Sequence, residues 1–252
     1  MILTPGGDVD YESTGHGYAV QRRTDPRIAA LIQDELGDAR TVLNVGAGAG
    51  SYEPGDRYVL AVEPSARMRA QRPATAAPAL RAYAEDLPFD DDSFDAALAT
   101  VTVHQWSDPA RGLAELRRVA RGAVVVLTFD GDALDRFWLA EYAPQLIAEE
   151  RRRYPRIGDI AAAIGDRSEV VDVPIPIDCA DGFAEAFYAR PEELLDPRVR
   201  AAQSAWNFVD DPEAAVTRLR ADLTSGAWDA RHGHLRTQHS FAGSLRLVVG
   251  RP

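Results

Sequence analysis

Lysine is absent from this chain of 252 residues, and all 28 of its basic residues are arginine. Without a lysine amine, the protein cannot form a Schiff base with a carbonyl compound or hold phosphates as a P-loop does. The absence also excludes the catalytic Tyr/Lys pair of one large class of dehydrogenases. Any chemistry must come from the remaining side chains.

Cysteine is nearly absent, since Cys179 is the only one. A single thiol allows no intrachain disulfide and no thiolate metal site. The histidines and acids show no spacing typical of metal ligands, and the consecutive acids Asp90–Asp92 are typical of a solvated loop. We therefore expect no bound metal.

Long apolar runs are missing too. The longest obvious one, Gly122–Phe129, is far too short to cross a bilayer, and the first residues lack the basic and apolar parts of a signal peptide. The 39 acidic and 28 basic residues give a net charge of −11, which would repel nucleic acids and anionic membranes. We expect a cytoplasmic protein, monomeric or homodimeric, that acts on a small molecule and not on a nucleic acid or a membrane.

The first half of the chain alternates short apolar runs with helical patterns, which is typical of a parallel α/β sheet. Asp25-Pro26 begins a helix that ends at Gly37, and Asp108-Pro109 begins another, because aspartate suits the N-cap and proline the first turn. The expected strands are Thr41–Val45, Tyr58–Glu63, Leu80–Ala84, Phe94–Val101 and Ala123–Phe129.

The second half has a different pattern. It predicts one long helix over Asp132–Arg153, a helix near Asp159–Ile164, a proline-interrupted edge strand over Val170–Ile177 and a closing strand over Ser240–Val249. The fold class is therefore α/β: a seven-stranded, mostly parallel sheet with helices on both faces. Residues 179–239 are expected to form a helical cap inserted before the last strand.

A glycine-rich turn is the first motif that carries chemistry. The buried strand Val42–Val45 runs directly into Gly46-Ala47-Gly48-Ala49-Gly50. Glycines at alternate positions let the backbone approach a ligand that any side chain would block. Taken alone, this motif fits any nucleotide- or nucleoside-binding fold.

Acidic residues follow the next two strands. Glu63 ends the second strand, where a carboxylate can accept hydrogen bonds from a ribose diol. Glu85 and Asp86 follow the third, where an acid can bind an adenine amino group while the Leu87 N–H satisfies a ring nitrogen. Because the carboxyl ends of parallel strands meet at one edge of a sheet, the turn and the acids predict a nucleoside site there.

With these motifs, residues 41–130 resemble the class I S-adenosylmethionine-dependent methyltransferases, and most of all their small-molecule branch of quinone and natural-product enzymes. The resemblance rests on the turn, on Glu63-Pro64-Ser65 followed by Met68, on Ala84–Phe89 and on Ala99–Trp106. It implies a Rossmann-like core, with S-adenosylmethionine as cofactor and S-adenosylhomocysteine as product. The core would comprise residues 25–178 and 240–252, and residues 1–24 would cover the cofactor.

The resemblance also implies roles for single residues. Gly46 and Gly48 would face the methionine part of the cofactor, Met68 the adenine, and Glu63 the ribose. The family usually has an acid where Asn44 stands, so this chain keeps a hydrogen-bond acceptor there but loses a charge near the cofactor's ammonium group. The expected cofactor-binding residues are Tyr18, Arg23, Asn44, Gly46, Ala47, Gly48, Gly50, Glu63, Pro64, Met68, Glu85, Asp86, Leu87, Thr100 and Val101.

Methyl transfer from a sulfonium is an in-line displacement, and it needs a general base only where the acceptor must lose a proton. His104, just after the fourth strand, is the first candidate for that base and Tyr18 the second, although a packing role for His104 fits the sequence equally well. Arg22 or Arg23 could pair with the cofactor's carboxylate. The expected acceptor-binding residues are His16, His104, Trp106, Phe137, Trp138 and Trp206.

Two other functions remain open at this point. One is a protein that binds S-adenosylmethionine without methylating, either a cyclase or a regulatory module, because fold alone does not determine chemistry. The other is an NAD(P)-dependent oxidoreductase, although Ser51 stands where that fingerprint has its third glycine and Asp86 would have no task there.

Overall fold

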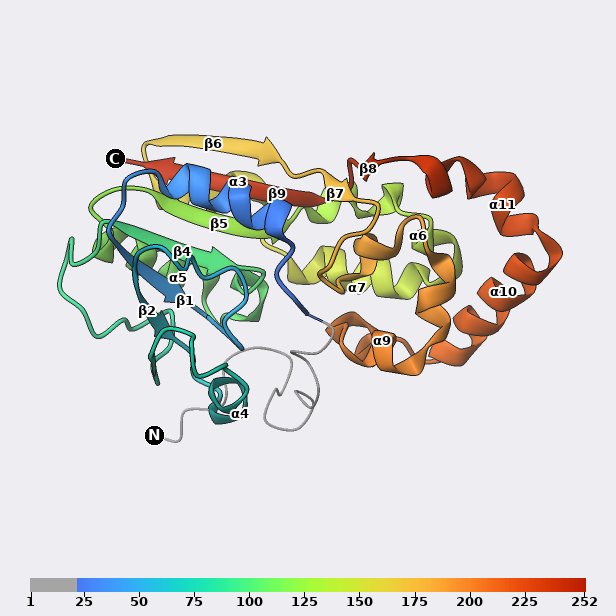
Figure 1. Cartoon of the computed structure of the whole chain (residues 1–252), viewed down its shortest axis with the longest axis horizontal. Coiled ribbons are helices and arrows are strands. Elements are labelled where there is room, and N and C mark those ends of the chain that lie inside the picture. The colour runs from blue at the N-terminus through green and yellow to red at the C-terminus, as the bar shows by residue number, and fades with distance from the viewer. Residues whose placement is uncertain (1–21) are drawn as a thin grey trace.

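The computed structural model describes residues 22–252, and its core is a seven-stranded sheet (Figure 1). The strands of this sheet are β1 (Thr41–Val45), β2 (Tyr58–Val62), β3 (Ala79–Leu80), β4 (Ala96–Thr100), β5 (Val124–Phe129), β6 (Arg167–Asp172) and β9 (Leu245–Arg251). They lie in the order β3-β2-β1-β4-β5-β9-β6. Strands β1 to β5 are parallel, and β9 is antiparallel to both of its neighbours. The predicted fold class, a Rossmann-like and mostly parallel sheet, is confirmed.

Two helices begin as their sequence predicts. In α3 (Pro26–Leu36), the Asp25 side chain accepts a hydrogen bond from the Arg27 N–H, and Gly37 ends the helix with a φ of 51°. In α5 (Pro109–Val119), Asp108 accepts from the Arg111 N–H in the same way. The aspartates satisfy amide groups that the first turn leaves unpaired.

Helices cover both faces of the sheet. Helix α3 buries Ile28 and Ile32 against one face, while α5 and α8 (Ile157–Ile164) bury Leu116 and Ile160 against the other. In Figure 1, α3 lies in front of the strands and α5 behind them. The short helix α4 (Ala66–Ala70) follows β2, with Ser65 at its N-cap.

The long helix expected over Asp132–Arg153 is wrong. The structure divides it into the 3₁₀ helix η2 (Gly131–Arg136), α6 (Leu139–Tyr142) and α7 (Pro144–Arg153). Pro144 is the physical reason for the second break, because it lacks an amide hydrogen and clashes with the preceding turn unless it stands at the start of a helix.

Two of the expected strands are also divided. The region over Val170–Ile177 forms the edge strand β6 and a separate β7 (Ile175–Pro176), with Pro174 between them. The closing region forms β8 (Ser240–Phe241) and β9, and β7 pairs with β8 in a small sheet of its own. The third strand is shorter than expected, since β3 has only two residues.

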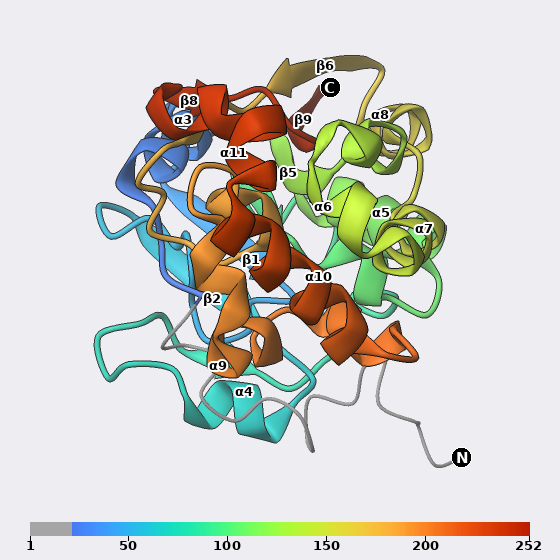
Figure 2. The same ribbon diagram turned by 90° about the vertical axis from the view of Figure 1, so that its right-hand side faces the viewer.

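A helical layer lies beyond the carboxyl ends of the parallel strands (Figures 1 and 2). Its elements between β7 and β8 are η3 (Ala184–Phe187), η4 (Pro191–Leu195), α9 (Pro197–Ala201), η5 (Ser204–Phe208), α10 (Pro212–Ser225), α11 (Ala227–His232) and η6 (Gly233–Thr237). Helices α6 and α7 pack against this insertion. The helical insertion predicted before the last strand is therefore present. Within residues 22–252, no helix combines the length and the apolar character that crossing a bilayer requires.

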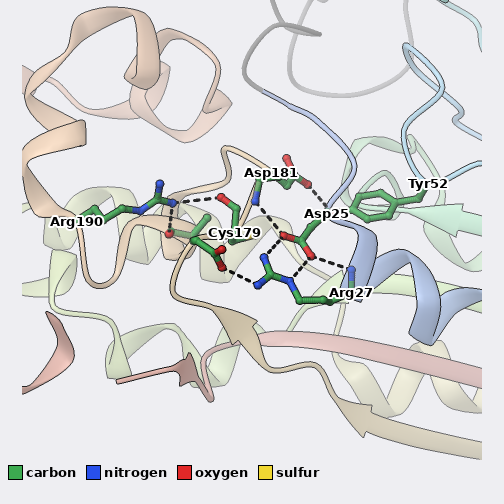
Figure 3. A network of polar contacts seen from close by, with 9 residues as sticks. Asp25, Arg27, Tyr52, Cys179, Asp181 and Arg190 are labelled. Carbon is green, nitrogen blue, oxygen red and sulfur yellow. Dashed lines mark hydrogen bonds and ion pairs between the residues drawn. The ribbon is translucent and has the colours of Figure 1, made fainter. Parts of the chain in front are cut away.

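Polar contacts tie the insertion to the start of α3 (Figure 3). The buried Asp25 accepts a hydrogen bond from the Ala180 N–H at 3.0 Å in addition to its bonds from Arg27. Asp181 pairs with Arg22 at 2.6 Å and accepts from the Tyr52 hydroxyl at 3.0 Å. These contacts hold residues 180–181 against the part of the core that carries the glycine-rich turn.

Candidate functional site

The glycine-rich turn has the backbone that its composition predicts. Gly46, Gly48 and Gly50 have φ angles of 67°, 51° and 96°, which side chains rarely allow. A Cβ atom on Gly46 would lie 2.1 Å from the Thr102 hydroxyl oxygen, so the turn packs directly on the segment after β4. A Cβ on Gly48 would lie 3.4 Å from the end of Met68. The turn thus meets two of the other motifs.

Glu63 lies beside this turn. One oxygen of its carboxylate accepts from the Gly48 N–H at 2.8 Å, and the other accepts from the Ser65 N–H at 2.8 Å. Burial raises the pKa of Glu63, although both N–H groups and the charges of Arg69 and Arg72 act in the opposite direction. Glu63 is 7% exposed, so little of the carboxylate is open to solvent.

The acids after β3 separate into two environments. Glu85 accepts hydrogen bonds from the Ser107 hydroxyl and the Asp108 N–H, so it supports the start of α5. The Asp86 side chain is exposed, which leaves it the more accessible carboxylate of the two. The Leu87 N–H, expected to face an adenine ring nitrogen, donates to Glu115 instead at 3.0 Å. That part of the expectation needs correction, since α5 already satisfies this donor.

Asn44 is fully buried one residue before the end of β1. Its amide nitrogen donates to Glu53 at 3.0 Å, and Glu53 also forms a buried ion pair with Arg72 at 2.7 Å. Arg72 in turn donates to the Gly48 carbonyl at 3.3 Å. A carboxylate is therefore present next to Asn44, supplied by Glu53.

The chain before α3 lies across the turn. The Ser51 hydroxyl donates to the Arg22 carbonyl at 3.4 Å, and the Tyr52 N–H donates to the Thr24 hydroxyl at 2.9 Å. Arg23 is exposed. The candidates His16 and Tyr18 lie outside the described residues.

A cavity of about 60 Å³ adjoins this region, between the ends of β4 and β5 and the helical insertion. Val101 and His104 line it on either side of Thr102, the residue in contact with Gly46, and Arg22 lines it from the chain before α3. Val101 has a φ of 50°. This conformation is strained for a β-branched residue, and such strain concentrates at functional sites.

Buried polar atoms without partners gather at the same edge. Among residues 22–252, eight buried side-chain nitrogen and oxygen atoms lack a hydrogen-bond partner. Five of them belong to Asn44, His104, Gln105 and Thr128, at or just after the carboxyl ends of the neighbouring strands β1, β4 and β5. Buried polar groups are normally satisfied. This concentration fits a crevice whose polar partners come from a ligand.

The chain is similar to known proteins in sequence and in fold. Residues 43–127 match the family described as "Methyltransferase domain". An uncharacterized methyltransferase of Mycobacterium tuberculosis is 44% identical over 171 residues, which are 63% of this chain and 63% of that protein. A solved structure from Anabaena variabilis, provisionally assigned as a methyltransferase from an antibiotic biosynthesis pathway, has a TM-score of 0.85 at 29% identity. It covers 91% of this chain and 98% of that one.

Residues 43–127 of this chain form a methyltransferase domain of the class I, S-adenosylmethionine-dependent kind. The cofactor of this domain is S-adenosylmethionine. The matched region spans less than two thirds of the mycobacterial relative. A malonyl-[acyl-carrier protein] O-methyltransferase of Halorhodospira halophila is a more distant relative, 25% identical over 70% of this chain and 62% of that protein.

The residues of the methyltransferase domain fit an adenosyl ligand. The glycine-rich turn and Glu63 directly follow the adjacent strands β1 and β2, and Asp86 lies six residues after the end of the short strand β3. The side-chain oxygen of Asn44 is a buried acceptor without a partner among the described residues. Pro64, Met68, Thr100 and Val101 lie at or just after the ends of β2 and β4. Their individual contacts with the cofactor stay predictions.

Of the acceptor-binding candidates within residues 22–252, His104 is the one that lines the cavity. Its Nδ1 is buried and has no partner among residues 22–252. Burial holds the pKa of His104 well below its usual range, and the charges of Arg153 and Arg22 act in the same direction. The imidazole is therefore neutral near pH 7 and disfavours an added proton.

The other aromatic candidates among the described residues do not line the cavity. Trp106 packs against Gly112 of α5, and Phe137 packs against Trp138 in the core. The Trp138 indole N–H donates to the Tyr188 carbonyl. Trp206 donates to Gln203, a lining residue, without lining the cavity itself.

Sequence reasoning missed most of the cavity. Glu150 and Tyr154 reach it from α7 and its end, Phe129 from β5, and Phe183 and Glu185 from the insertion. The only sequence signal was the spacing of Leu146, Glu150 and Tyr154, which places them on one helical face. The run of Glu and Arg residues around Glu150 obscures that signal, because consecutive charged residues are usual on a solvent-exposed helix face.

Proposed function

We propose that this protein transfers a methyl group from S-adenosylmethionine to a small-molecule acceptor bound in the cavity. The observation that carries the proposal is the position of the cavity, which adjoins the glycine-rich turn through Thr102 and combines apolar walls with His104 and Glu150. Such a concave, mixed surface beside a cofactor site is typical of an acceptor pocket. The net charge of −11 supports a small molecule over a nucleic acid.

The cofactor would lie along the ends of β1, β2 and β3. Glu63 would accept hydrogen bonds from the ribose hydroxyls, and the exposed Asp86 would accept from the adenine amino group. The cofactor's ammonium group is its remaining hydrogen-bond donor. The unpartnered side-chain oxygen of Asn44 and the nearby carboxylate of Glu53 would accept hydrogen bonds from it. When bound, the cofactor supplies an electrophilic methyl group on a positively charged sulfur.

The chain's own contribution to methyl transfer would be alignment and exclusion of water. The helical insertion, assigned here as the substrate cap at residues 179–239, closes the cavity with Phe183, Ala184 and Ala205. Residues 1–24 are proposed to cover the cofactor, and the contacts of Ser51 and Tyr52 with residues 22 and 24 support this for the described part. His104 would hydrogen-bond the acceptor through a neutral imidazole.

Calorimetric titration with S-adenosylhomocysteine tests the first half of the proposal, and tight binding is expected. The second half is tested by incubating the protein and methyl-labelled cofactor with small-molecule extract, then searching for labelled products by mass spectrometry. Binding without any labelled product would favour a non-methylating homologue. Tight NAD binding without S-adenosylhomocysteine binding would overturn the proposal in favour of an oxidoreductase.

A further inference from the structure

The cavity has a continuous aromatic lining that neither the family match nor the sequence motifs assign. Phe183 lies 5.3 Å from Phe129 between ring centroids, Phe129 lies 5.4 Å from Tyr154, and Tyr154 lies 4.6 Å from His104. All four rings line the cavity. In edge-to-face and tilted contacts of this kind, ring faces and edges stay available for contact with a further planar group. A planar, π-rich acceptor therefore suits this wall better than a saturated one.

A carboxylate stands next to the aromatic wall. Leu146, Glu150 and Tyr154 are spaced by four residues along α7 and its end, so that one face of the helix brings all three to the cavity. The Glu150 carboxylate forms an ion pair with Arg153 at 2.9 Å and receives a hydrogen bond from the Tyr154 hydroxyl. These contacts fix the orientation of the carboxylate.

Of the groups in this wall, Glu150 is the best suited to receive a proton. Burial raises its pKa, although Arg153 and Tyr154 act in the opposite direction. His104 faces the charges of Arg153 and Arg22, which oppose protonation of its ring. Glu185, the other carboxylate of the cavity, is bound by the N–H and hydroxyl of Ser244 and is 1% exposed. A proton from the acceptor could not reach the Glu185 carboxylate without breaking those bonds.

We propose that the acceptor is a planar phenol or enol, and that Glu150 takes its hydroxyl proton during methyl transfer. This inference rests on the proposed methyltransferase function. The acceptor oxygen forms the new bond to the methyl carbon, and the carbon–sulfur bond breaks with its electron pair remaining on sulfur. The hydroxyl proton passes to the Glu150 carboxylate. Tyr154 and Arg153 hold that carboxylate in place, and His104 contributes a neutral ring beside the acceptor.

The chain offers a matched control. Glu149 and Glu150 are consecutive residues of α7, and each forms an ion pair with the arginine three residues later. Only the Glu150–Arg153 pair reaches the cavity, because Arg152 is 68% exposed and Arg153 only 1%. Glu149→Gln therefore removes the same kind of helical ion pair without touching the acceptor.

The experiment uses phenol and 4-nitrophenol as probes, with cyclohexanol as a saturated control. Wild-type protein should methylate both phenols from labelled cofactor and leave cyclohexanol unchanged. Glu150→Gln should slow methylation of phenol about 10²- to 10⁴-fold, the usual contribution of a general base. It should slow methylation of 4-nitrophenol much less, because this more acidic phenol can enter the variant's cavity as the phenolate and then needs no base. Glu149→Gln should stay within about twofold of wild type, and Tyr154→Phe should fall between the two glutamate variants.

A second readout is independent of turnover. With S-adenosylhomocysteine present, wild-type protein should bind 4-nitrophenol in its neutral form, as a donor to Glu150, so the visible absorbance of the phenolate falls on binding. Glu150→Gln should abolish that fall while retaining its affinity for S-adenosylhomocysteine. An unchanged fall in this variant, or an equal rate loss with both phenols, would overturn the role of Glu150.

The outcomes distinguish a failure of this inference from a failure of the proposed methyltransferase function. If the wild-type protein binds S-adenosylhomocysteine and labels some metabolite but neither binds nor methylates the two phenols, the acceptor class is wrong and the methyltransferase function stands. If it does not bind S-adenosylhomocysteine, the function itself fails.

Discussion

Among single residues, Glu63 connects the glycine-rich turn with the strand beside it. Its two oxygens already accept hydrogen bonds from the N–H groups of Gly48 and Ser65. The remaining lone pairs of the same oxygens can accept from a diol, so the side chain that shapes the turn is also the one proposed to bind the ribose. Hydrogen bonds to a charged group contribute about 1.5–3 kcal/mol each.

Replacing Glu63 by glutamine should therefore weaken binding of S-adenosylhomocysteine about 10- to 100-fold. Calorimetric titration measures this change. Glu35→Gln is the control, because Glu35 pairs with Arg251 on the surface, away from the strand ends that carry the turn. Equal affinity of the Glu63 variant and wild type would show that the carboxylate does not contact the ribose.

Gly46 offers a prediction about stability. Gly46→Ala should lower the melting temperature more than Gly37→Ala, by at least about 4 °C, since each kcal/mol corresponds to roughly 2–4 °C in a protein of this size. Both glycines have positive φ, at 67° and 51°, so both substitutions strain the backbone. Only at Gly46 does the new methyl group collide with Thr102, because nothing lies within 4 Å of a Cβ on Gly37.

The two glycine variants are compared by differential scanning calorimetry. Equal losses of melting temperature would mean that Thr102 moves aside without cost. The close packing of the turn on the segment after β4 would then contribute nothing to stability.

Among the elements, α3 depends on a cap that also binds a distant segment. The sequences Asp25-Pro26-Arg27 and Asp196-Pro197-Arg198 form the same local structure, in which the aspartate accepts from the arginine N–H and pairs with its side chain. Asp25 is fully buried and accepts an additional bond from the Ala180 N–H. Burial raises the pKa of Asp25, but the bonds from Arg27 and Ala180 together lower it to about 2.

Asp25→Ala should therefore destabilise the protein more than Asp196→Ala. Loss of an N-cap costs about 0.5–2 kcal/mol, which both variants share. Asp25→Ala also leaves a buried N–H of the insertion unsatisfied, at about 1–3 kcal/mol more. Urea denaturation of the two variants measures the difference in the free energy of unfolding. Similar values would indicate that the contact with Ala180 contributes nothing.

Secondary structure was predictable from the sequence where its cause is local. The helices at Asp25 and Asp108 begin as predicted because capping depends on adjacent residues, and β1 has the expected bounds because a run buried on both faces is unambiguous. The helix over 132–153 was mispredicted because its apolar spacing continues across Pro144. The proline is decisive for the backbone but does not alter the hydrophobic pattern.

At the scale of the whole molecule, the cavity proposed to hold the acceptor could not be read from local patterns. Its walls come from the ends of β4 and β5, from α7 and from the insertion, so residues such as Phe129, Glu150 and Phe183 meet only after the chain has folded. The cofactor motifs were recognisable because each follows a strand whose end lies at one edge of the sheet. Trp106, Phe137 and Trp138 were predicted to bind the acceptor from their residue type, and none of them lines this cavity.

Glu185 connects the insertion to the segment before the closing strand. The pH dependence of stability tests how this contact contributes. Glu185 is fully buried, and its carboxylate accepts from the N–H and hydroxyl of Ser244, between β8 and β9. Burial raises its pKa from 4.5 to about 7, although the bonds from Ser244 and the charge of Arg246 act in the opposite direction. The folded protein thus binds this proton more tightly than the unfolded chain does.

The sign of the effect follows from that difference. The contribution of Glu185 to stability is fully present below pH 4.5 and is lost as the pH rises through about 7, with a total on the order of 3 kcal/mol. Glu185→Gln, which cannot ionise, should therefore show a flatter dependence of melting temperature on pH between 5 and 8 than wild type. Parallel curves for the two proteins would mean that the carboxyl group gains or loses its proton equally in the folded and unfolded states. In that case the buried carboxyl group of Glu185 would not make the packing of the insertion against the core depend on pH.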